Sequence, residues 1–415
     1  METAPKSLRL HLALFGRTNV GKSSFLNLVT NQDVSIISSQ PGTTTDVVEK
    51  QMELLPLGPV LWLDTAGLDD TSSLAGKRIA KTNRVFKRTD ILLLLTEPNR
   101  WGEYEDTVVK EAKKRNIPFI IVINKTDRQE PTAEFMNRIN SITGHNFLCS
   151  STDLKQRDLY VSHLKQHLIE LCPDDFITPP PLISDLLEKD GLAVLIVPID
   201  LEAPKGRLIL PQMQTIRDTL DRGASSLVTK ESEYSAVLNR LAENPDIVVC
   251  DSQVVDKMVA ETPADVPCTT FSILFARNKG DLNALVEGAA QIENLNPGDR
   301  VLIAEACTHH PVEDDIGREK IPRWLEDYCG CSLDFEVYGG KDFPDNLEEY
   351  ELIIHCGGCM LNRRHVLSRL QQAREQGVAI TNYGICISHV HGVLKRVLTP
   401  FPETMGSYEK IKNSF

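Results

Sequence analysis

The sequence predicts an α/β protein with three domains. Short apolar runs that suit buried strands alternate with amphipathic patterns that suit helices, an order typical of parallel sheets covered by helices. A glycine-rich loop at residues 16–23 lies at one such strand-to-helix junction. The dense prolines at Pro173 and Pro179–Pro181 indicate a stiff linker after the first domain. The expected domains are residues 1–172, 173–264 and 265–415.

The composition argues against some classes of binding partner. The chain has 415 residues, a formal net charge of -13 and a pI near 5.3, which argues against a nucleic-acid backbone as the main partner. No apolar run approaches the roughly 20 residues of a membrane span, and the start at Met1–Lys6 has no secretory pattern. We therefore expect a cytoplasmic protein with no nucleic-acid and no membrane partner. In that compartment, ten cysteines favour metal or redox chemistry over disulfides.

The first domain carries a phosphate-binding loop. Residues 16–23 read G-R-T-N-V-G-K-S, between an apolar run and a helical pattern, which is the context that this motif needs. Backbone N–H groups of such a loop and of the following helix bind phosphates. Lys22 is expected to reach the β and γ oxygens, and Ser23 to ligate Mg²⁺. The predicted phosphate-binding residues are Gly16, Asn19, Val20, Gly21, Lys22, Ser23 and Ser24.

Further residues are expected at the magnesium ion and the γ-phosphate. The box D-T-A-G begins with Asp64, expected in the second magnesium shell, and ends with Gly67, whose amide is expected near the γ-phosphate. The run Q-P-G-T-T-T-D at residues 40–46 resembles the switch I loop of Era-like and tRNA-modification GTPases, in which a threonine closes over magnesium. We choose Thr44 for this role, with its two threonine neighbours as alternatives. Lys22, Ser23, Thr44, Asp64 and Gly67 form the predicted catalytic set.

Two later boxes predict recognition of guanine. Asn124 and Lys125 begin the box N-K-T-D, and its Asp127 can accept hydrogen bonds from the N1–H and the exocyclic amine of guanine, a donor pair that adenine lacks. Ser150 and Ser151 follow an apolar run and fit the last base-contacting loop. Four boxes in this order predict a P-loop GTPase that binds GTP, GDP and Mg²⁺.

Slow intrinsic hydrolysis is expected. Leu68 follows the D-T-A-G box, where Ras-like proteins carry the glutamine that orients water. Relatives with a hydrophobic residue here often use a potassium ion held by an asparagine of the phosphate loop, and Asn19 has that position. The alternative for Asn19 is a simple turn residue.

The middle domain, residues 173–264, is expected to be a small dimerisation domain. Strands are predicted at 192–199, 226–229 and 247–250, separated by helices at 212–222 and 234–243. A three-stranded sheet with exposed edges is usually covered or paired, so we expect this domain to dimerise edge to edge. The alternative is docking against its neighbours in the chain.

The last domain, residues 265–415, is expected to be doubly wound α/β. We predict a strand at 271–276, a helix at 282–295 and four further strands that begin near Val301, Phe335, Leu352 and Ala379. Soft ligands follow two of these strands, as C-x-H at 307–309 and H-C-x-x-C at 355–359. Because the carboxyl ends of parallel strands open into one crevice, these ligands are expected to meet there. Spacing alone leaves zinc and an iron–sulfur cluster open.

The GTPase boxes, the small middle domain and the C-x-H … H-C-x-x-C set together resemble the [FeFe]-hydrogenase maturation GTPase family. The resemblance implies a [4Fe-4S] cluster with His309 and His355 as cluster-site histidines, and with the cysteine ligands Cys307, Cys356 and Cys359. The fourth ligand stays open between His309, His355, a carboxylate such as Asp314 and an exchangeable group.

The same resemblance implies what the protein does. It would be a scaffold or carrier that receives a two-iron fragment with CO and CN ligands from two radical-SAM maturases. It would deliver this subcluster of the H-cluster to apo [FeFe]-hydrogenase. We expect a homodimer, with a tetramer as the alternative.

Two other interpretations compete with this one. An RNA- or ribosome-associated assembly GTPase with a structural zinc would have a nearly identical first domain, but the acidic charge and the lack of a basic, aromatic-interleaved stretch count against it. A purely structural protein conflicts with the intact Lys22, Ser23 and Asp64.

Overall fold

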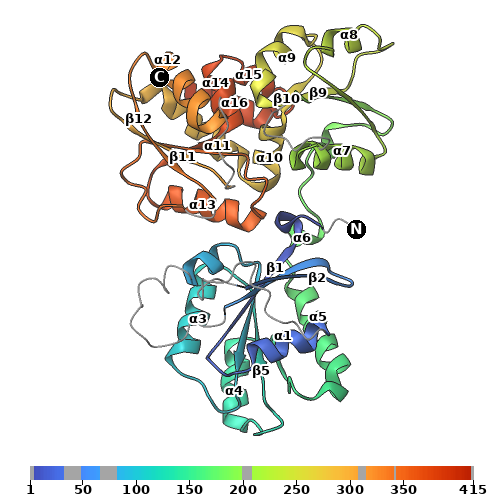
Figure 1. Ribbon diagram of the computed structural model, residues 1–415, viewed down its shortest axis with the longest axis vertical. Helices are drawn as coiled ribbons and strands as arrows, with labels where there is room; N and C mark the ends of the chain where they lie inside the picture. Colours follow the sequence, from blue (N-terminus) through green and yellow to red (C-terminus); the bar gives the residue numbers. More distant parts are fainter. Residues whose placement is uncertain are drawn as a thin grey trace. The chain divides into compact units, whose positions relative to one another are not determined.

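The computed structural model divides the chain into two compact units, an N-terminal unit (Met1–Pro179) and a C-terminal unit (Pro180–Phe415) (Figure 1). The structure describes residues 4–31, 48–65, 82–198, 208–306, 315–340 and 343–412. Within these ranges no helix has both the length and the apolar character that crossing a membrane requires.

The N-terminal unit is built on a six-stranded sheet of order β2-β3-β1-β4-β5-β6, parallel except for the antiparallel pair of β2 and β3. Its strands are β1 (Leu10–Gly16), β2 (Val48–Leu54), β3 (Gly58–Asp64), β4 (Ile91–Thr96), β5 (Phe119–Ile123) and β6 (Asn146–Leu148). Its described α-helices are α1 (Lys22–Thr30), α3 (Glu103–Lys114), α4 (Ala133–Ile142), α5 (Arg157–Leu171) and α6 (Asp174–Ile177). One apolar cluster packs α1 and α5 on one face, and a second packs α3 and α4 on the other. Burial on both faces explains why the central strands read as unbroken apolar runs.

The C-terminal unit contains two four-stranded parallel sheets, β10-β9-β7-β8 and β12-β11-β13-β14. The strands are β7 (Leu192–Ile196), β8 (Ser225–Thr229), β9 (Ile247–Cys250), β10 (Cys268–Thr270), β11 (Arg300–Ala304), β12 (Asp334–Tyr338), β13 (Leu352–His355) and β14 (Ala379–Asn382). The α-helices are α7 (Leu210–Arg222), α8 (Tyr234–Leu238), α9 (Val255–Glu261), α10 (Phe271–Lys279), α11 (Leu282–Ala289), α12 (Ile321–Cys329), α13 (Arg363–Glu375), α14 (Tyr383–Val390), α15 (Leu394–Val397) and α16 (Pro402–Lys412). A π-helical turn, Ile316–Lys320, precedes α12.

The two sheets of the C-terminal unit share one apolar core. Buried side chains form a continuous cluster from Leu182 to Tyr408 that includes strands of both sheets. Helix α10 contacts α7, which follows the first sheet's strand β7, and also α13 and α14, which flank the second sheet. The domain boundary expected near residue 264 falls inside this shared core and stays a prediction.

The prediction of a strand at residues 271–276 is wrong. These residues form helix α10, because the hydroxyl of Thr270 accepts a hydrogen bond from the backbone N–H of Ile273 and caps the helix. The run is apolar except for Ser272, and a short run of this kind does not reveal its period. The strand lies just before it, as β10, which gives the first sheet four strands where three were predicted.

Candidate functional site

The nucleotide boxes described by the structure meet at one cavity of about 540 Å³ in the N-terminal unit. Most of its lining comes from the loop between β1 and α1 and from the turn after β5. Both turns lie at the carboxyl ends of parallel strands, where such sheets bind ligands. The lining residues are Thr18, Asn19, Gly21, Lys22, Ser23, Ser24, Asn124, Lys125, Asp127, Arg128, Ser151 and Thr152.

The phosphate loop needs its glycines for space and for backbone conformation. Gly21 has a φ of 99°, and a Cβ there would lie 2.4 Å from Nδ2 of Asn124. Asn19 also adopts a left-handed conformation, with a φ of 65°, which asparagine tolerates better than most residues. Lys22 is buried, and its Nζ donates to the carbonyl oxygens of Gly16 and Arg17. The lysine is therefore held against the loop that is expected to bind phosphate.

Asn124 joins three segments of the site. This side chain is 1% exposed, and its Nδ2 donates to the carbonyl of Val20 at 2.8 Å. Its Oδ1 accepts from the backbone N–H of Ser151 at 3.0 Å and from the hydroxyl of Ser151 at 2.8 Å. The phosphate loop, the N-K-T-D box and the last predicted base loop are thus fixed to one another.

The base-reading side of the cavity is also held in place. The hydroxyl of Ser150 donates to Oδ1 of Asp127 at 2.6 Å, which orients the carboxylate that is expected to read guanine. Lys125 lies across the phosphate loop, because its Nζ donates to the carbonyl of Asn19 and pairs with Glu97.

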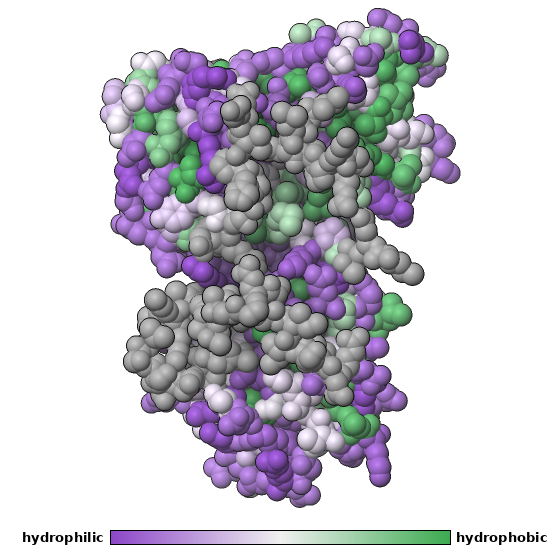
Figure 2. Space-filling view, viewed as in Figure 1, coloured by the Kyte–Doolittle hydropathy of each residue, from purple (hydrophilic) through white to green (hydrophobic). Residues whose placement is uncertain are grey.

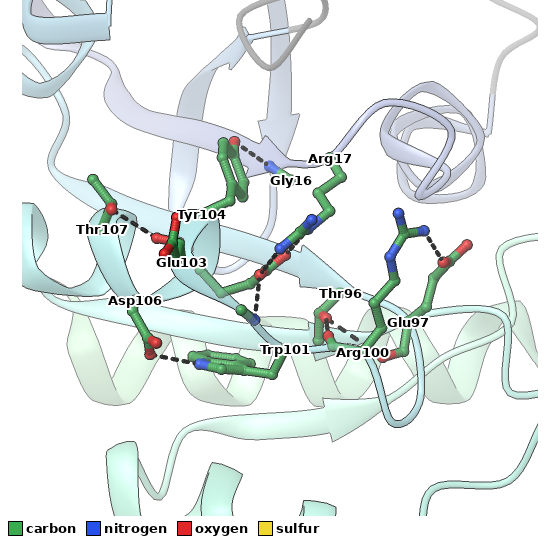
Figure 3. Close-up of polar contacts among 12 residues, drawn as sticks. Gly16, Arg17, Thr96, Glu97, Arg100, Trp101, Glu103, Tyr104, Asp106 and Thr107 are labelled. Carbon is green, nitrogen blue, oxygen red and sulfur yellow. Dashed lines mark hydrogen bonds and ion pairs between the residues drawn. The ribbon is translucent and has the colours of Figure 1, made fainter. Parts of the chain in front are cut away.

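One anchor of the phosphate loop was not anticipated from the sequence. Figure 3 shows Arg17 and Gly16 directed at α3. Arg17 makes a bidentate ion pair with Glu105, with nitrogen–oxygen distances of 2.7 and 2.6 Å, and Gly16 donates its N–H to the hydroxyl of Tyr104 at 3.2 Å. Glu105 is 1% exposed and also accepts from the N–H of Gly102 at 2.9 Å, which caps α3. The sequence signal that could have revealed this contact is Glu105, which is the third residue of a helical pattern.

The remaining predicted magnesium and γ-phosphate residues are only partly described. Asp64 ends β3 and is buried, 6% exposed, at the carboxyl edge of the sheet that also carries the phosphate loop. Thr44, Gly67 and Leu68 lie outside the described residues, so their roles stay predictions.

The second candidate site lies at the carboxyl edge of the sheet β12-β11-β13-β14. The connection after β11 leads to β12 on one side, and the connection after β13 leads to β14 on the other side, which makes the β11–β13 boundary a topological switch point. Cys356 directly follows β13, and its N–H donates to the carbonyl of Ala304 at 2.9 Å. Its Sγ accepts from the N–H of Ala306 at 3.1 Å. Ala306 is the residue before Cys307, which, like His309 and Asp314, lies outside the described residues.

The two described thiols are kept protonated by their surroundings. Burial raises the pKa of Cys356 to about 11, although backbone hydrogen bonds from Gly358 and Ala306 oppose the shift. Burial also raises the pKa of Cys359, against an opposing effect of Lys279. A thiolate here therefore needs a compensating positive charge, which a bound metal or cluster supplies. Backbone N–H groups directed at sulfur are also typical of iron–sulfur sites, so these residues fit such a group.

The turn between the two cysteines depends on one of its glycines. Gly358 has a φ of 61°, and a Cβ there would lie 3.2 Å from Cγ2 of Val366. At Gly357 the nearest atom to such a Cβ, Oγ of Ser272, is 4.0 Å away. Only Gly358 is therefore required by backbone conformation and by space.

A buried lysine, missed by the sequence analysis, holds this loop. Lys279, the last residue of α10, is 4% exposed, and its Nζ lies 5.3 Å from the ring centre of Phe275. Its Nζ donates to the carbonyl oxygens of Gly358 at 3.3 Å, Cys359 at 3.0 Å and Leu361 at 2.9 Å. Burial lowers the pKa of Lys279 to about 8, and the nearby thiols oppose this shift. The lysine fixes the path of the chain around Cys359.

Both ring nitrogens of His355 are engaged by protein groups. Arg369, which is 1% exposed, donates from Nη1 to Nε2 of His355 at 2.9 Å and from Nη2 to the carbonyl of Gly340 at 3.1 Å. Because a guanidinium only donates, Nε2 is the acceptor, and Nδ1 carries the proton that it donates to the carbonyl of Cys356. Burial, followed by the charge of Arg369, lowers the pKa of His355 to about 3. The imidazole is neutral, and its role toward a cluster stays a prediction.

Three family models match the chain. One described as the hydrogen maturase F dimerization domain matches residues 182–280, and one described as the hydrogen maturase F tetramerization domain matches residues 283–400. Together these two matches cover more than half of the chain. A third model, described as a 50S ribosome-binding GTPase, matches residues 11–125.

Curated relatives match the N-terminal unit. The tRNA modification GTPase MnmE of Prochlorococcus marinus (strain NATL1A) is 37% identical over 120 residues, 28% of this chain and 25% of the relative. GTPase Der of Deinococcus deserti is 33% identical over 128 residues, 30% of this chain and 29% of the relative. The chain thus spans about a quarter of the length of these relatives.

Solved structures of GTPases also resemble the chain. A crystal structure of Aquifex aeolicus Era bound to GDP and aluminium fluoride is 19% identical, with a TM-score of 0.33, and the match covers 53% of this chain and 93% of that one. The G domain of the T. maritima FeoB iron transporter is 19% identical, with a TM-score of 0.29, and covers 39% of this chain and 98% of its own.

Proposed function

This chain belongs to the hydrogen maturase F family, and on that premise we propose that it is a GTP-hydrolysing scaffold and carrier for the two-iron subcluster of the H-cluster of [FeFe]-hydrogenase. The main support for the proposal is that one chain contains a P-loop GTPase domain and both oligomerization domains of that family. The thiol pair beside the end of β11 supports it, because its donor atoms suit iron.

In the GTPase reaction, the residues of this chain bind the nucleotide and orient its phosphates and its base. The N–H groups of the phosphate loop and Nζ of Lys22 bind the phosphate oxygens, while Asp127 and the loop at Ser150 and Ser151 select guanine. Magnesium, when bound, neutralises charge on the β and γ oxygens, and it would be held by Ser23, Asp64 and Thr44. Asn19 would hold a potassium ion at the same loop.

At the thiol site we propose a [4Fe-4S] cluster. Its ligands would be Cys307, Cys356 and Cys359, with His309 and His355 as cluster-site histidines. The cluster would supply an iron whose fourth ligand would be His309, His355, a carboxylate such as Asp314 or an exchangeable group. His355 would serve only if Arg369 released its Nε2. The chain's own contribution is the loop geometry that Lys279 and Gly358 fix around Cys359.

The family's oligomerization domains support an oligomer, and we propose that dimers pair through β8. This strand is an edge of its sheet, and Val228 on it is 44% exposed. The preceding helix α7 exposes Met213 by 50% and Leu220 by 55%. Figure 2 shows apolar side chains on the side of the C-terminal unit where Figure 1 draws α7. An exposed apolar edge strand is one that proteins usually pair. In a tetramer, residues 283–400 would form the additional contacts between dimers.

The proposed partners are the two radical-SAM maturases and apo-hydrogenase, in the cytoplasm. GTP turnover would time the binding and release of the maturases, while the cluster chemistry takes place at the thiol site. The boxes of the N-terminal unit and the thiols of the C-terminal unit are separate sets of residues, which supports this division of roles.

Anaerobic reconstitution with iron and sulfide tests the cluster. We expect a brown protein with about four irons and four acid-labile sulfides per chain. Cys359→Ser should lose at least half of that iron, whereas Cys331→Ser, a half-buried cysteine outside the site, should load like the wild type. A colourless wild-type protein that takes up zinc and no sulfide would overturn the cluster and favour an RNA- or ribosome-associated GTPase with a structural zinc.

A further inference from the structure

Two histidines and a glutamate converge in the N-terminal unit, outside the nucleotide cavity. His145 directly precedes β6, and His167 and Glu170 lie on α5. One ligand atom from each residue lies within 4.8 Å of the others. The two Nδ1 atoms are 3.4 Å apart, and Oε2 of Glu170 is 3.5 Å from Nδ1 of His145 and 3.7 Å from Nδ1 of His167. Nothing in the GTPase reaction uses these groups.

The distances suit a bound cation better than direct hydrogen bonds. Each of the three separations exceeds the roughly 2.7–3.2 Å of an ordinary hydrogen bond between such atoms. A tetrahedral zinc ion with ligand bonds of about 2.0–2.1 Å places its ligand atoms roughly 3.3–3.4 Å from one another. The three atoms therefore match one face of such a tetrahedron to within a few tenths of an ångström.

The surroundings orient the rings and leave the site accessible. The ring of His167 stacks on buried Phe147, with centroids 6.0 Å apart, and meets the ring of His145 edge to face at 5.5 Å. The side chains of His145, His167 and Glu170 are 33%, 17% and 45% exposed, so an ion and a water ligand can reach them. Ordered rings with solvent access are what a three-ligand metal site requires.

We propose that His145, His167 and Glu170 form a binding site for a divalent transition-metal ion of the zinc type. Two imidazoles and a carboxylate are donors that Zn²⁺, Co²⁺ and Ni²⁺ accept, and water completes the tetrahedron. This donor set contains no sulfur, which separates it chemically from the thiol site of the C-terminal unit.

The position of the site gives the ion a structural role. The carboxyl end of β6 leads to Ser150 and Ser151, and α5 returns the chain from that loop. The three ligands lie at the other end of the same β6–α5 pair, because His145 precedes the strand and Glu170 is near the end of the helix. A bound ion would tie β6 to α5 and stabilise the segment that carries the predicted guanine-contacting loop.

Cobalt titration of the full-length chain tests the proposal, in a Cys356→Ser/Cys359→Ser background that removes the thiol pair. We expect one equivalent of Co²⁺ to bind at micromolar concentration, with visible bands of tetrahedral cobalt and without a sulfur-to-cobalt charge-transfer band. Zn²⁺ should displace it and raise the unfolding temperature. The pair His145→Ala/His167→Ala should weaken Co²⁺ binding at least tenfold while GDP binding, which reports the fold, persists.

The matched control is His163→Ala. His163 lies one turn before His167 on α5, and its ring contacts the same Phe147, yet it is not part of the triad. This variant should bind Co²⁺ within about twofold of its parent. Equal Co²⁺ affinity and stoichiometry with and without His145 and His167, or binding only at millimolar concentration, would overturn the proposal. Neither result bears on the [4Fe-4S] cluster, because two of its proposed ligands, Cys356 and Cys359, are absent from the test protein.

Discussion

The nucleotide cavity and the thiol site are built in different ways. The cavity is lined by contiguous boxes, each at a strand-to-helix turn, and its main internal bonds join one box to another, as Asn124 does. The thiol site is held by charged side chains from two helices: α10, whose Lys279 is 80 residues before Cys359, and α13, which closely follows the motif. Lys279 and Arg369 are both nearly inaccessible, and each is bonded to the segment of the H-C-x-x-C motif. The nucleotide boxes are thus joined mainly to one another, whereas the short cysteine motif depends on buried charged side chains that lie outside it.

Removal of the phosphate-loop lysine should have the largest effect, and it should affect the nucleotide cavity alone. Lys22→Ala removes the charge that binds the β and γ oxygens, so GTP hydrolysis should fall by about a hundredfold or more. Loading of iron and sulfide should not change, because the thiols lie in the other unit. The measurements are the turnover rate at saturating GTP and the iron content after anaerobic reconstitution.

The exposed Lys155→Ala in the same unit is the control for Lys22→Ala and should hydrolyse GTP normally. A Lys22→Ala protein that hydrolyses GTP within threefold of the wild type would contradict the assigned role. A variant that no longer turns over GTP but still delivers a fully active hydrogenase would refute the timing role of GTP and leave the cluster assignment intact.

Removal of the buried lysine at the thiol site should have the next largest effect. Lys279→Met keeps the apolar stem and removes the charged donor, which leaves three buried or partly buried carbonyl groups without that partner. Loss of such bonds should lower the free energy of unfolding of the apoprotein by about 2–4 kcal/mol. Iron loading should fall with it, and GTP hydrolysis should be unchanged. Denaturant titration and iron analysis measure the two effects.

Lys257→Met is the matched control for Lys279→Met, since Lys257 lies in the same unit with a side chain that is 42% exposed. It should change the free energy of unfolding by less than about 0.5 kcal/mol. If Lys279→Met loads a full cluster with unchanged stability, the three hydrogen bonds do not hold the cysteine loop.

This contrast explains what the sequence predicts and what it leaves out. The boxes at Gly16–Ser23 and Asn124–Asp127 both contribute to the lining of one cavity, and their patterns could be recognised because glycine geometry and strand-to-helix context are local properties. Lys279 was missed because the mostly apolar run that begins its helix at Phe271 reads equally well as a strand. The function of Arg369 depends on His355, which is fourteen residues away and on another element, and no local pattern reports that pairing.

The same reasoning applies to the predicted ligands. The doubly wound pattern predicts that β11 and β13 are parallel strands with their carboxyl ends at one edge, and the observed register brings Ala306 to the sulfur of Cys356. Sequence could therefore indicate which strand ends meet. It could not indicate that both nitrogens of His355 would be engaged by Arg369 and a backbone carbonyl, because that depends on the tautomer and on packing.

The smallest effect is expected at Glu105, a buried charge far in sequence from the phosphate loop that it contacts through Arg17. Glu105→Gln keeps the shape of the side chain and removes the charge that pairs with Arg17, while the amide oxygen can still cap Gly102. The phosphate loop should keep its path but lose one orienting contact, so GDP affinity should fall by about three- to tenfold, or about 1 kcal/mol. Glu103→Gln, on the same helix but exposed, should bind GDP like the wild type. Fluorescent-nucleotide titration measures both affinities.

An unchanged affinity for Glu105→Gln would mean that the boxes alone shape the cavity, and the contrast with the thiol site would then be complete. A loss of a hundredfold would mean that the cavity depends on a distant buried charge as strongly as the cysteine loop does.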